Sequence, residues 1–277
     1  MNIQGIALDL DRTTLDREGH LSPENRQALE KAIGQGVHII IASGRSFGAL
    51  PQEVTSIPGI EYAITSNGAA VYHVPTGRCL RRYLLNPEAV EQVLQITAGE
   101  PVSYEGFIEG EAFASADYIR NPVKYGATPK AVAYIQHTRR LEEDIVGFLR
   151  QHPAELESMD VIVADREIRD RLMDKLRTEI SDVYITSSVV QLIEISHRDG
   201  GKHNGVRFVL EQLGLSPENL AAFGDGDNDA EMLALAGCGI AVENATEACK
   251  AAADHVTLSH QENGVAYGMR RFLKLDC

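Results

Sequence analysis

Short apolar segments alternate along this chain with segments that carry helix-start and helix-end signals. Residues 37–43 read VHIIIAS, a run typical of a strand that is buried on both faces of a parallel sheet. Before it, the apolar run 3–10 is followed by a predicted helix that begins after Ser22 and ends before Gly36. A third apolar run at 62–67 completes a β-α-β-α-β order, which predicts a parallel, doubly wound sheet.

The C-terminal part of the chain shows the same alternation. The predicted elements are a helix that Gly214 ends, a strand at 220–225, a helix near 228–236, a strand at 239–243 and a closing helix near 264–273. The segment 84–189 carries its own signals, with helices at 86–96, 140–151 and 165–179 and strands at 155–164 and 183–188. We therefore predict an α/β fold with a Rossmann-like core domain from residues 1–83 and 190–277, interrupted by an inserted α+β domain.

The net charge of the chain limits its partners. The 277 residues include 26 basic and 40 acidic side chains, which give a formal charge of −14. Nucleic-acid binding needs a basic surface, so no nucleic-acid partner is expected, although a few basic residues can still bind one small phosphate. The 44% hydrophobic content is that of a globular protein that buries a sizeable core.

The sequence shows no sign of export or of a membrane partner. No apolar run approaches the ~18 residues that a membrane span needs. The N-terminus lacks the basic start and long apolar run of a signal peptide. The four cysteines are scattered, without zinc-ligand or C-x-x-C spacing. We expect a cytoplasmic protein with reduced thiols.

Polar side chains follow the predicted strands at the point where ligands bind in an open parallel sheet. The residues that this topology brings to one edge are Asp9, Asp11, Ser43, Gly44, Arg45, Asn67, Gly68, Lys202, Asp225, Asp227, Asn228 and Asp229. Each has a simple structural alternative. Two aspartates one residue apart often cap turns, a serine can be a helix N-cap, and a lysine usually lies in solvent. The loop that begins at Asp225 resembles a calcium loop but lacks its closing glutamate, and Asp227 fits a turn.

Taken together, these residues favour phosphate chemistry. Clustered carboxylates are costly unless a hard cation neutralises them, and oxygen ligands with water and a phosphate oxygen suit Mg²⁺. The Ser43 hydroxyl, backbone amides at a helix start and Lys202 would then bind the phosphate. A carboxylate can serve as a nucleophile that forms an aspartyl-phosphate, so Asp9 would attack phosphorus and Asp11 would manage the proton.

As an ordered set, these motifs resemble those of the haloacid dehalogenase superfamily of phosphohydrolases. The matching segments are DLDRTTLD, IIIASGR, the isolated Lys202 and GDGDNDAEML. The segments TSNGAAVY and 239–269 are similar to the Cof-like subfamily, which has a large α/β cap. The resemblance covers nearly the whole chain and is weakest within 84–189, which would be the cap that determines substrate specificity.

The resemblance implies a role for each motif residue. Asp9 would be the nucleophile and a Mg²⁺ ligand, and Asp11 the general acid/base that binds the metal through its backbone carbonyl. Asp225 would complete the metal ligands, with Asp229 as support. The phosphate ligands would be Ser43, Gly44, Lys202, Asn228 and the Leu10 amide. An aspartate at position 11 argues against dehalogenase chemistry.

Two positions depart from the family pattern. Arg12 stands where glycine is usual, and Thr14 stands where an apolar residue is common. Because glycine tolerates backbone angles that arginine resists, we expect a local difference in the turn. Two orientations of the Arg12 side chain are open: it adds a positive charge near the phosphate, or it points to solvent, which is the orientation we favour.

The expected activity is Mg²⁺-dependent hydrolysis of small phosphorylated metabolites, with sugar phosphates as the favoured substrate class. Two alternatives remain open at this point: a phosphomutase that uses the same intermediate, and a catalytically weak metal-binding regulatory protein.

Overall fold

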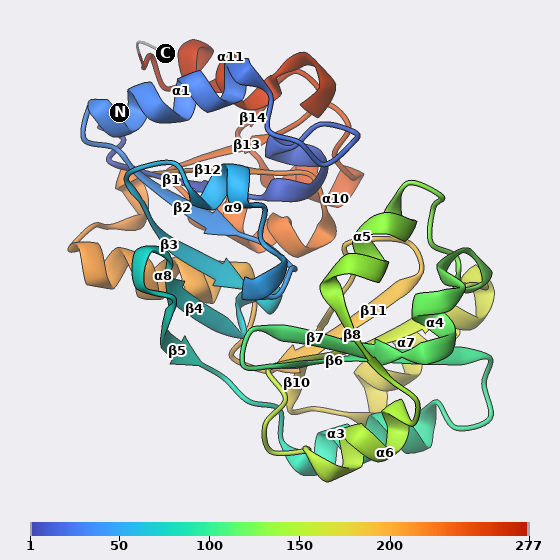
Figure 1. Ribbon diagram of the computed structural model, residues 1–277. Helices are drawn as coiled ribbons and strands as arrows, with labels where there is room; N and C mark the ends of the chain where they lie inside the picture. Colours follow the sequence, from blue (N-terminus) through green and yellow to red (C-terminus); the bar gives the residue numbers. More distant parts are fainter. Residues whose placement is uncertain (1, 276–277) are drawn as a thin grey trace. The chain divides into compact units, whose positions relative to one another are not determined.

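The chain forms two compact units, each with its own sheet, in a computed structural model that describes residues 2–275 (Figure 1). The first unit contains the residues up to Arg45, then Leu50–Arg81, then the residues from Gly201 onward. The second unit contains Ser46–Ala49 and Arg82–Gly200. The second unit therefore interrupts the first in the sequence.

The sheet of the first unit has the strand order β14-β13-β12-β1-β2-β3-β4-β5. The strands are β1 (Gly5–Leu8), β2 (His38–Ala42), β3 (Ile60–Thr65), β4 (Ala70–His73), β5 (Arg78–Arg82), β12 (Leu220–Gly224), β13 (Cys238–Ala241) and β14 (His255–Val256). Neighbouring strands from β14 to β3 are parallel, and β4 is antiparallel to β3. The predicted parallel core is confirmed, with β1 near its middle.

Helices cover both faces of this sheet. They are α1 (Pro23–Gly34), α2 (Gln52–Thr55), α8 (Lys202–Leu213), α9 (Ala230–Leu235), α10 (Glu247–Ala252) and α11 (Gly264–Arg271). Along β1, Ile6 and Leu8 pack with α1 and α11, whereas Ala7 packs with α8, α9 and α10. Because both faces are buried, the strand is apolar throughout rather than alternating. The sheet is doubly wound, as the sequence predicts.

The second unit is built on a sheet of order β10-β11-β9-β6-β7-β8. Its strands are β6 (Val102–Ile108), β7 (Glu111–Ser115), β8 (Arg139–Glu142), β9 (Ser158–Val163), β10 (Val183–Thr186) and β11 (Leu192–His197). Its helices are α3 (Pro87–Ile96), α4 (Ala116–Arg120), α5 (Ala131–Thr138), α6 (Ile145–Gln151) and α7 (Arg166–Glu179). One face packs on α3, α6 and α7, and the other on α4 and α5.

The boundary of the second unit differs from the prediction. We expected the inserted domain to end at residue 189, but it continues to Gly200 because β11 pairs with β9 and β10. The sequence predicts one helix over 140–151, and this prediction is wrong for the first part of the segment. Residues 139–142 form β8 beside β7, and the helix begins only after Asp144, whose side chain accepts a hydrogen bond from the amide of Gly147.

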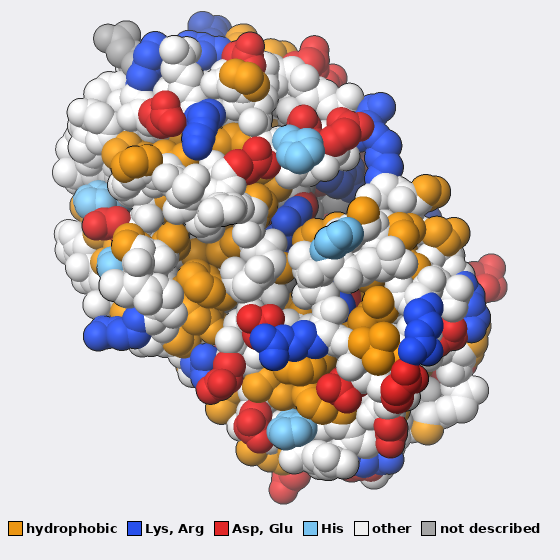
Figure 2. Space-filling model, in the orientation of Figure 1, with side chains coloured by type: hydrophobic (Ala, Val, Ile, Leu, Met, Phe, Trp, Pro, Cys, Tyr) orange, Lys and Arg blue, Asp and Glu red, His pale blue; other side chains and the backbone are white. Residues whose placement is uncertain are grey.

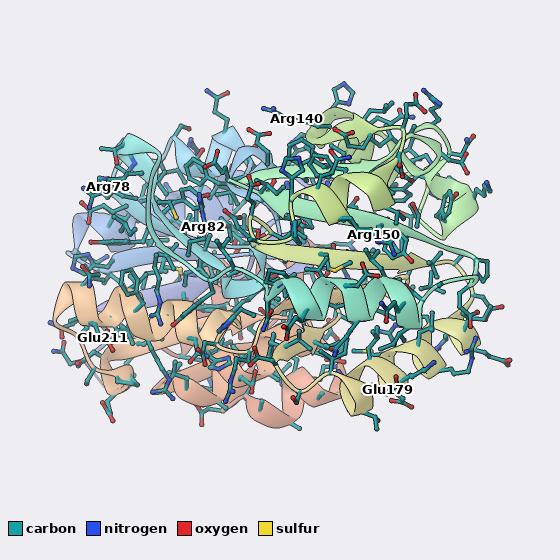
Figure 3. The ribbon with its side chains drawn as sticks, turned by 90° about the horizontal axis from the view of Figure 1, so that it is seen from below. Arg78, Arg82, Arg140, Arg150, Glu179 and Glu211 are labelled. Carbon is teal, nitrogen blue, oxygen red and sulfur yellow. The ribbon has the colours of Figure 1, made fainter. Side chains whose placement is uncertain are left out.

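Ion pairs connect elements within the second unit. Arg150 on α6 binds Glu91 on α3, with 2.9 Å between Nε and Oε2. Arg82 lies 2.9 Å from Glu157, a fully buried carboxylate. Figure 3 labels both arginines. A buried charge needs such a partner, so the second unit can hold Glu157 away from water.

Acidic and basic side chains are interspersed over the face of the molecule in Figure 2. Among the described helices, none combines the length and apolar character that crossing a bilayer requires.

Candidate active site

Four neighbouring strands of the first unit, in the order β12-β1-β2-β3, deliver polar residues to one edge of the sheet. Asp225 follows β12, Asp9 follows β1, Ser43 follows β2, and Asn67 lies in the turn after β3. Because these strands run parallel, their carboxyl ends meet, which is the convergence that the sequence predicts.

The carboxylates of Asp9, Asp225 and Asp229 form a buried acidic trio. Ligand oxygens of the three residues all lie within 4.8 Å of one another. The backbone amides of Asp225 and Gly226 both donate to Oδ2 of Asp229 at 3.0 Å. These two hydrogen bonds hold the loop between β12 and α9 in place, so Asp229 fixes the position of Asp225.

Lys202 is a fully buried cation that contacts two carboxylates of the acidic trio. Its Nζ donates to Oδ1 of Asp9 and to Oδ1 of Asp229, both at 2.7 Å. The alternative of a solvated lysine at a helix end is therefore wrong. One positive charge bridges two of the three carboxylates, which leaves the trio short of positive charge.

The pKa values of these groups reflect that imbalance. Burial, and then the nearby carboxylate of Asp229, raises the pKa of Asp9 well above its ordinary value. The same two causes raise the pKa of Asp225 to about 7, against the opposing effect of Arg12 and Lys202. Burial by itself would lower the pKa of Lys202, but the carboxylates of Asp229 and Asp9 raise it, so the lysine stays protonated.

The turn after β3 positions Lys202. Ser66, Asn67 and Gly68 have positive φ values of 48°, 51° and 94° in succession. A Cβ on Gly68 would lie 2.1 Å from the carbonyl oxygen of Gly201, and the amide of Gly201 donates to the carbonyl of Asn67 at 2.8 Å. This close approach docks the start of α8, whose first residue is Lys202, against the turn.

Ser43 and Asn228 take part in local hydrogen bonds. The buried Ser43 hydroxyl accepts from the amide of Arg45 at 3.1 Å, so it stabilises the turn after β2, and it donates to no described residue. Nδ2 of Asn228 donates to Oδ1 of Asn67 at 2.9 Å. Oδ1 of Asn228 is buried without a hydrogen-bond partner.

The Asp11 side chain is not a member of the trio but pairs with Arg45. Arg45 donates from Nε to Oδ2 of Asp11 at 2.8 Å and from Nη2 to Oδ1 at 2.6 Å. The sequence places Arg45 at this edge, because it comes directly after Ser43-Gly44 at a strand end, but it predicts no role for this arginine.

Arg12 and Thr14 both act in this site. Thr14 is buried, and its hydroxyl donates to the carbonyl of Asp9 at 2.6 Å, which explains a polar residue there. The expectation that Arg12 points to solvent is wrong in part. Its side chain is 56% exposed, yet Nε lies 3.5 Å from Oδ2 of Asp225. Asp227 is exposed and accepts a hydrogen bond from Thr246, as a turn residue would.

The donor set fits a hard divalent cation. Oδ2 of Asp9 is buried without a hydrogen-bond partner, next to the carboxylate of Asp225. A buried carboxylate oxygen without a donor is costly, and a metal ion would satisfy it. All the ligand atoms are oxygens, which are the ligands that Mg²⁺ and Ca²⁺ prefer.

Comparisons with known proteins agree with this geometry. The family model for haloacid dehalogenase-like hydrolases matches residues 6–269. Phosphatase YwpJ of Bacillus subtilis is 29% identical, with 97% of this chain and 99% of the relative aligned. A second B. subtilis relative, the 5-amino-6-(5-phospho-D-ribitylamino)uracil phosphatase YcsE, is 27% identical over 99% of this chain and 97% of its own length.

A solved structure shows the same fold. The haloacid dehalogenase-like hydrolase from B. subtilis superposes with a TM-score of 0.84 and 25% identity, over 98% of this chain and 100% of that chain. The buried trio with its lysine, the matched family model and the similarity to phosphatases lead to one conclusion: this chain belongs to the haloacid dehalogenase-like hydrolase family and is a phosphatase.

Proposed function

We propose that this phosphatase hydrolyses monoesters of small phosphorylated metabolites with Mg²⁺, through an aspartyl-phosphate on Asp9. The observation that carries the proposal is the state of the Asp9 carboxylate. One oxygen is held by Lys202 at 2.7 Å, and the other is buried without a partner beside Asp225. A carboxylate so oriented is suited to binding a cation and attacking a phosphate.

The metal would be held by Asp9, Asp225 and the backbone carbonyl of Asp11, with Asp229 in support. When bound, Mg²⁺ supplies positive charge that balances the carboxylates and the incoming phosphate. The phosphate would contact the Ser43 hydroxyl, the backbone at Gly44 and Leu10, and Lys202. The hydroxyl hydrogen of Ser43 is available for this, because its oxygen accepts from Arg45 while the hydroxyl donates to no described residue.

Asn228 would complete the phosphate site only after its amide turns. In the present orientation its Nδ2 binds Asn67, and the remaining Oδ1 is an acceptor that repels an anion. If both amides rotate, Nδ2 of Asn67 donates to Oδ1 of Asn228, and Nδ2 of Asn228 becomes free to donate to the phosphate.

The reaction would proceed in two displacements. A carboxylate oxygen of Asp9 forms a bond to phosphorus while the bond from phosphorus to the ester oxygen breaks, and Asp11 donates a proton to that oxygen. A water oxygen then attacks phosphorus, Asp11 accepts its proton, and inorganic phosphate leaves as Asp9 is restored. Asp11 is paired with Arg45 in the structure, so it must release that arginine to act.

We propose polyol and sugar phosphates as the substrate class. The relative YcsE is named for a phosphate ester of a ribityl chain, which is such a polyol. A panel of sugar phosphates, polyol phosphates and nucleotides, assayed for phosphate release, tests this choice. Release without any bisphosphate activator separates hydrolysis from a mutase reaction.

Metal dependence tests the mechanism directly. EDTA should abolish phosphate release, and Mg²⁺ should restore it, because the acidic trio would otherwise repel the substrate. Ca²⁺ should restore little activity, since its longer and looser coordination misplaces the attacking oxygen. Full activity in EDTA would refute the metal assignment.

A further inference from the structure

Arg12 has a backbone conformation that arginine rarely adopts. In the turn that follows β1, its φ is 61° and its ψ is 12°, which is the left-handed region. The Cβ of any residue other than glycine makes this region unfavourable. Such strain persists only where the surrounding structure holds the residue in place, and it is concentrated at functional sites.

Two residues from the C-terminal part of the chain hold Arg12. Nδ2 of Asn244 donates to the carbonyl of Arg12 at 2.9 Å. Oδ1 of Asn244 accepts from the backbone amide of His260 at 3.0 Å and lies 2.8 Å from Nδ1 of the same histidine. His260 is buried, so it fixes the position of Asn244, and Asn244 in turn holds the Arg12 backbone.

The braced side chain reaches Asp225 with a second positive charge. Its Nε lies 3.5 Å from Oδ2 of Asp225, while Lys202 binds the other two carboxylates of the trio. The two cations differ in freedom. The Lys202 side chain is 0% exposed, whereas that of Arg12 is 56% exposed, so water can hydrate the guanidinium when it leaves Asp225.

We infer that Arg12 is a displaceable counter-ion that competes with the divalent cation for Asp225, an inference that rests on the proposed metal site. In the metal-free protein, Arg12 neutralises part of the charge of Asp225. When a divalent cation binds to Asp225, the Arg12 guanidinium must move away from that carboxylate, because two positive charges beside the same carboxylate repel each other. Arg12 therefore weakens metal binding relative to a chain with a neutral residue at this position.

Arg12→Gln isolates the charge, because glutamine keeps the left-handed strain and much of the side-chain length. Exposed ion pairs change an equilibrium constant by a factor of about five or less. We expect Arg12→Gln to bind Mg²⁺ two- to fivefold more tightly (roughly) than the wild type, measured by isothermal titration calorimetry on metal-stripped full-length protein. The difference should shrink as KCl is added, because salt screens exposed charges.

Arg17→Gln is the matched control. Arg17 is exposed in the same segment, and no ion pair joins it to the acidic trio in the described part of the chain. This variant makes the same change in net charge and should bind Mg²⁺ as the wild type does. A second readout is the rise in melting temperature on adding Mg²⁺. This rise should be larger for Arg12→Gln than for the wild type or for Arg17→Gln.

Asp225→Asn separates the possible failures. If wild-type binding is lost in Asp225→Asn while Arg12→Gln binds no more tightly than the wild type, the inference about Arg12 is refuted and the metal site stands. Equal tightening in Arg17→Gln would also refute it, since net charge would then explain the effect. If the wild type binds no Mg²⁺, or Asp225→Asn binds it equally well, the metal assignment and the inference fail together.

Discussion

Replacing Lys202 by methionine tests whether this buried cation holds the acidic trio together. Methionine keeps the unbranched apolar stem of the side chain and lacks only its terminal ammonium group, so the change removes the charge and its two hydrogen bonds, both 2.7 Å long. The carboxylates of Asp9 and Asp229 then remain buried without their counter-charge.

The cost follows from that burial. Removing one partner of a buried ion pair costs about 3–5 kcal/mol, because it leaves an uncompensated buried charge. At 2–4 °C per kcal/mol for a domain of this size, the melting temperature should fall by roughly 6–20 °C. Mg²⁺ should recover part of this loss, since it supplies charge to the same carboxylates, and kcat/KM should fall by about 10²–10³.

Thermal unfolding in EDTA, followed by circular dichroism, measures the effect. The control is Lys250→Met, because Lys250 is partly exposed and pairs with Glu247 only on the surface, at 3.6 Å. That pair should contribute less than about 1 kcal/mol. If Lys202→Met melts at the same temperature as Lys250→Met, Lys202 is not the counter-charge of the trio, and the electrostatic argument for the site is wrong.

Two further variants test other parts of the site. Asp11→Asn should lower kcat/KM for a sugar phosphate by about 10²–10⁴ but affect p-nitrophenyl phosphate far less, because only the alkoxide leaving group needs the acid; equal losses would exclude the acid role. Gly68→Ala should cost more than about 1 kcal/mol in unfolding free energy. The control is Gly36→Ala, because Gly36 has a similar φ but no atom within 4 Å of an added Cβ, whereas a Cβ on Gly68 meets Gly201. Gly68→Ala should therefore cost more than Gly36→Ala, and equal costs would show that the contact with Gly201 is not tight.

Local sequence signals were sufficient for the core and for much of the site. Buried parallel strands are apolar throughout, helix caps such as Ser22 have a fixed residue preference, and strand order brings the strand ends to one edge. The amide of Asn25 does donate to the Ser22 hydroxyl, as the cap requires. For the same reason Asp9 and Asp225 meet, although they lie 216 positions apart in the sequence.

Other features depend on contacts between residues that are distant in the sequence. The position of β11 near the end of the inserted segment leaves its domain open in the sequence, and its pairing with β9 assigns it to the second unit. Likewise residues 139–142 form a strand because they pair with the edge of β7. Pairing energy of this kind is not encoded in the segment itself, so local propensity could not predict it.

For the charged residues of the site, the sequence likewise determines some properties and the tertiary structure determines others. The sequence alone identified Asp9, Lys202 and Asp225 as polar residues at strand and helix ends, because residue type and position carry that information. Whether Lys202 is solvated or buried, and whether Arg12 points outward or toward Asp225, depended on where the surrounding backbone placed them. Electrostatic energy varies with distance and burial, and only the tertiary structure determines those two quantities.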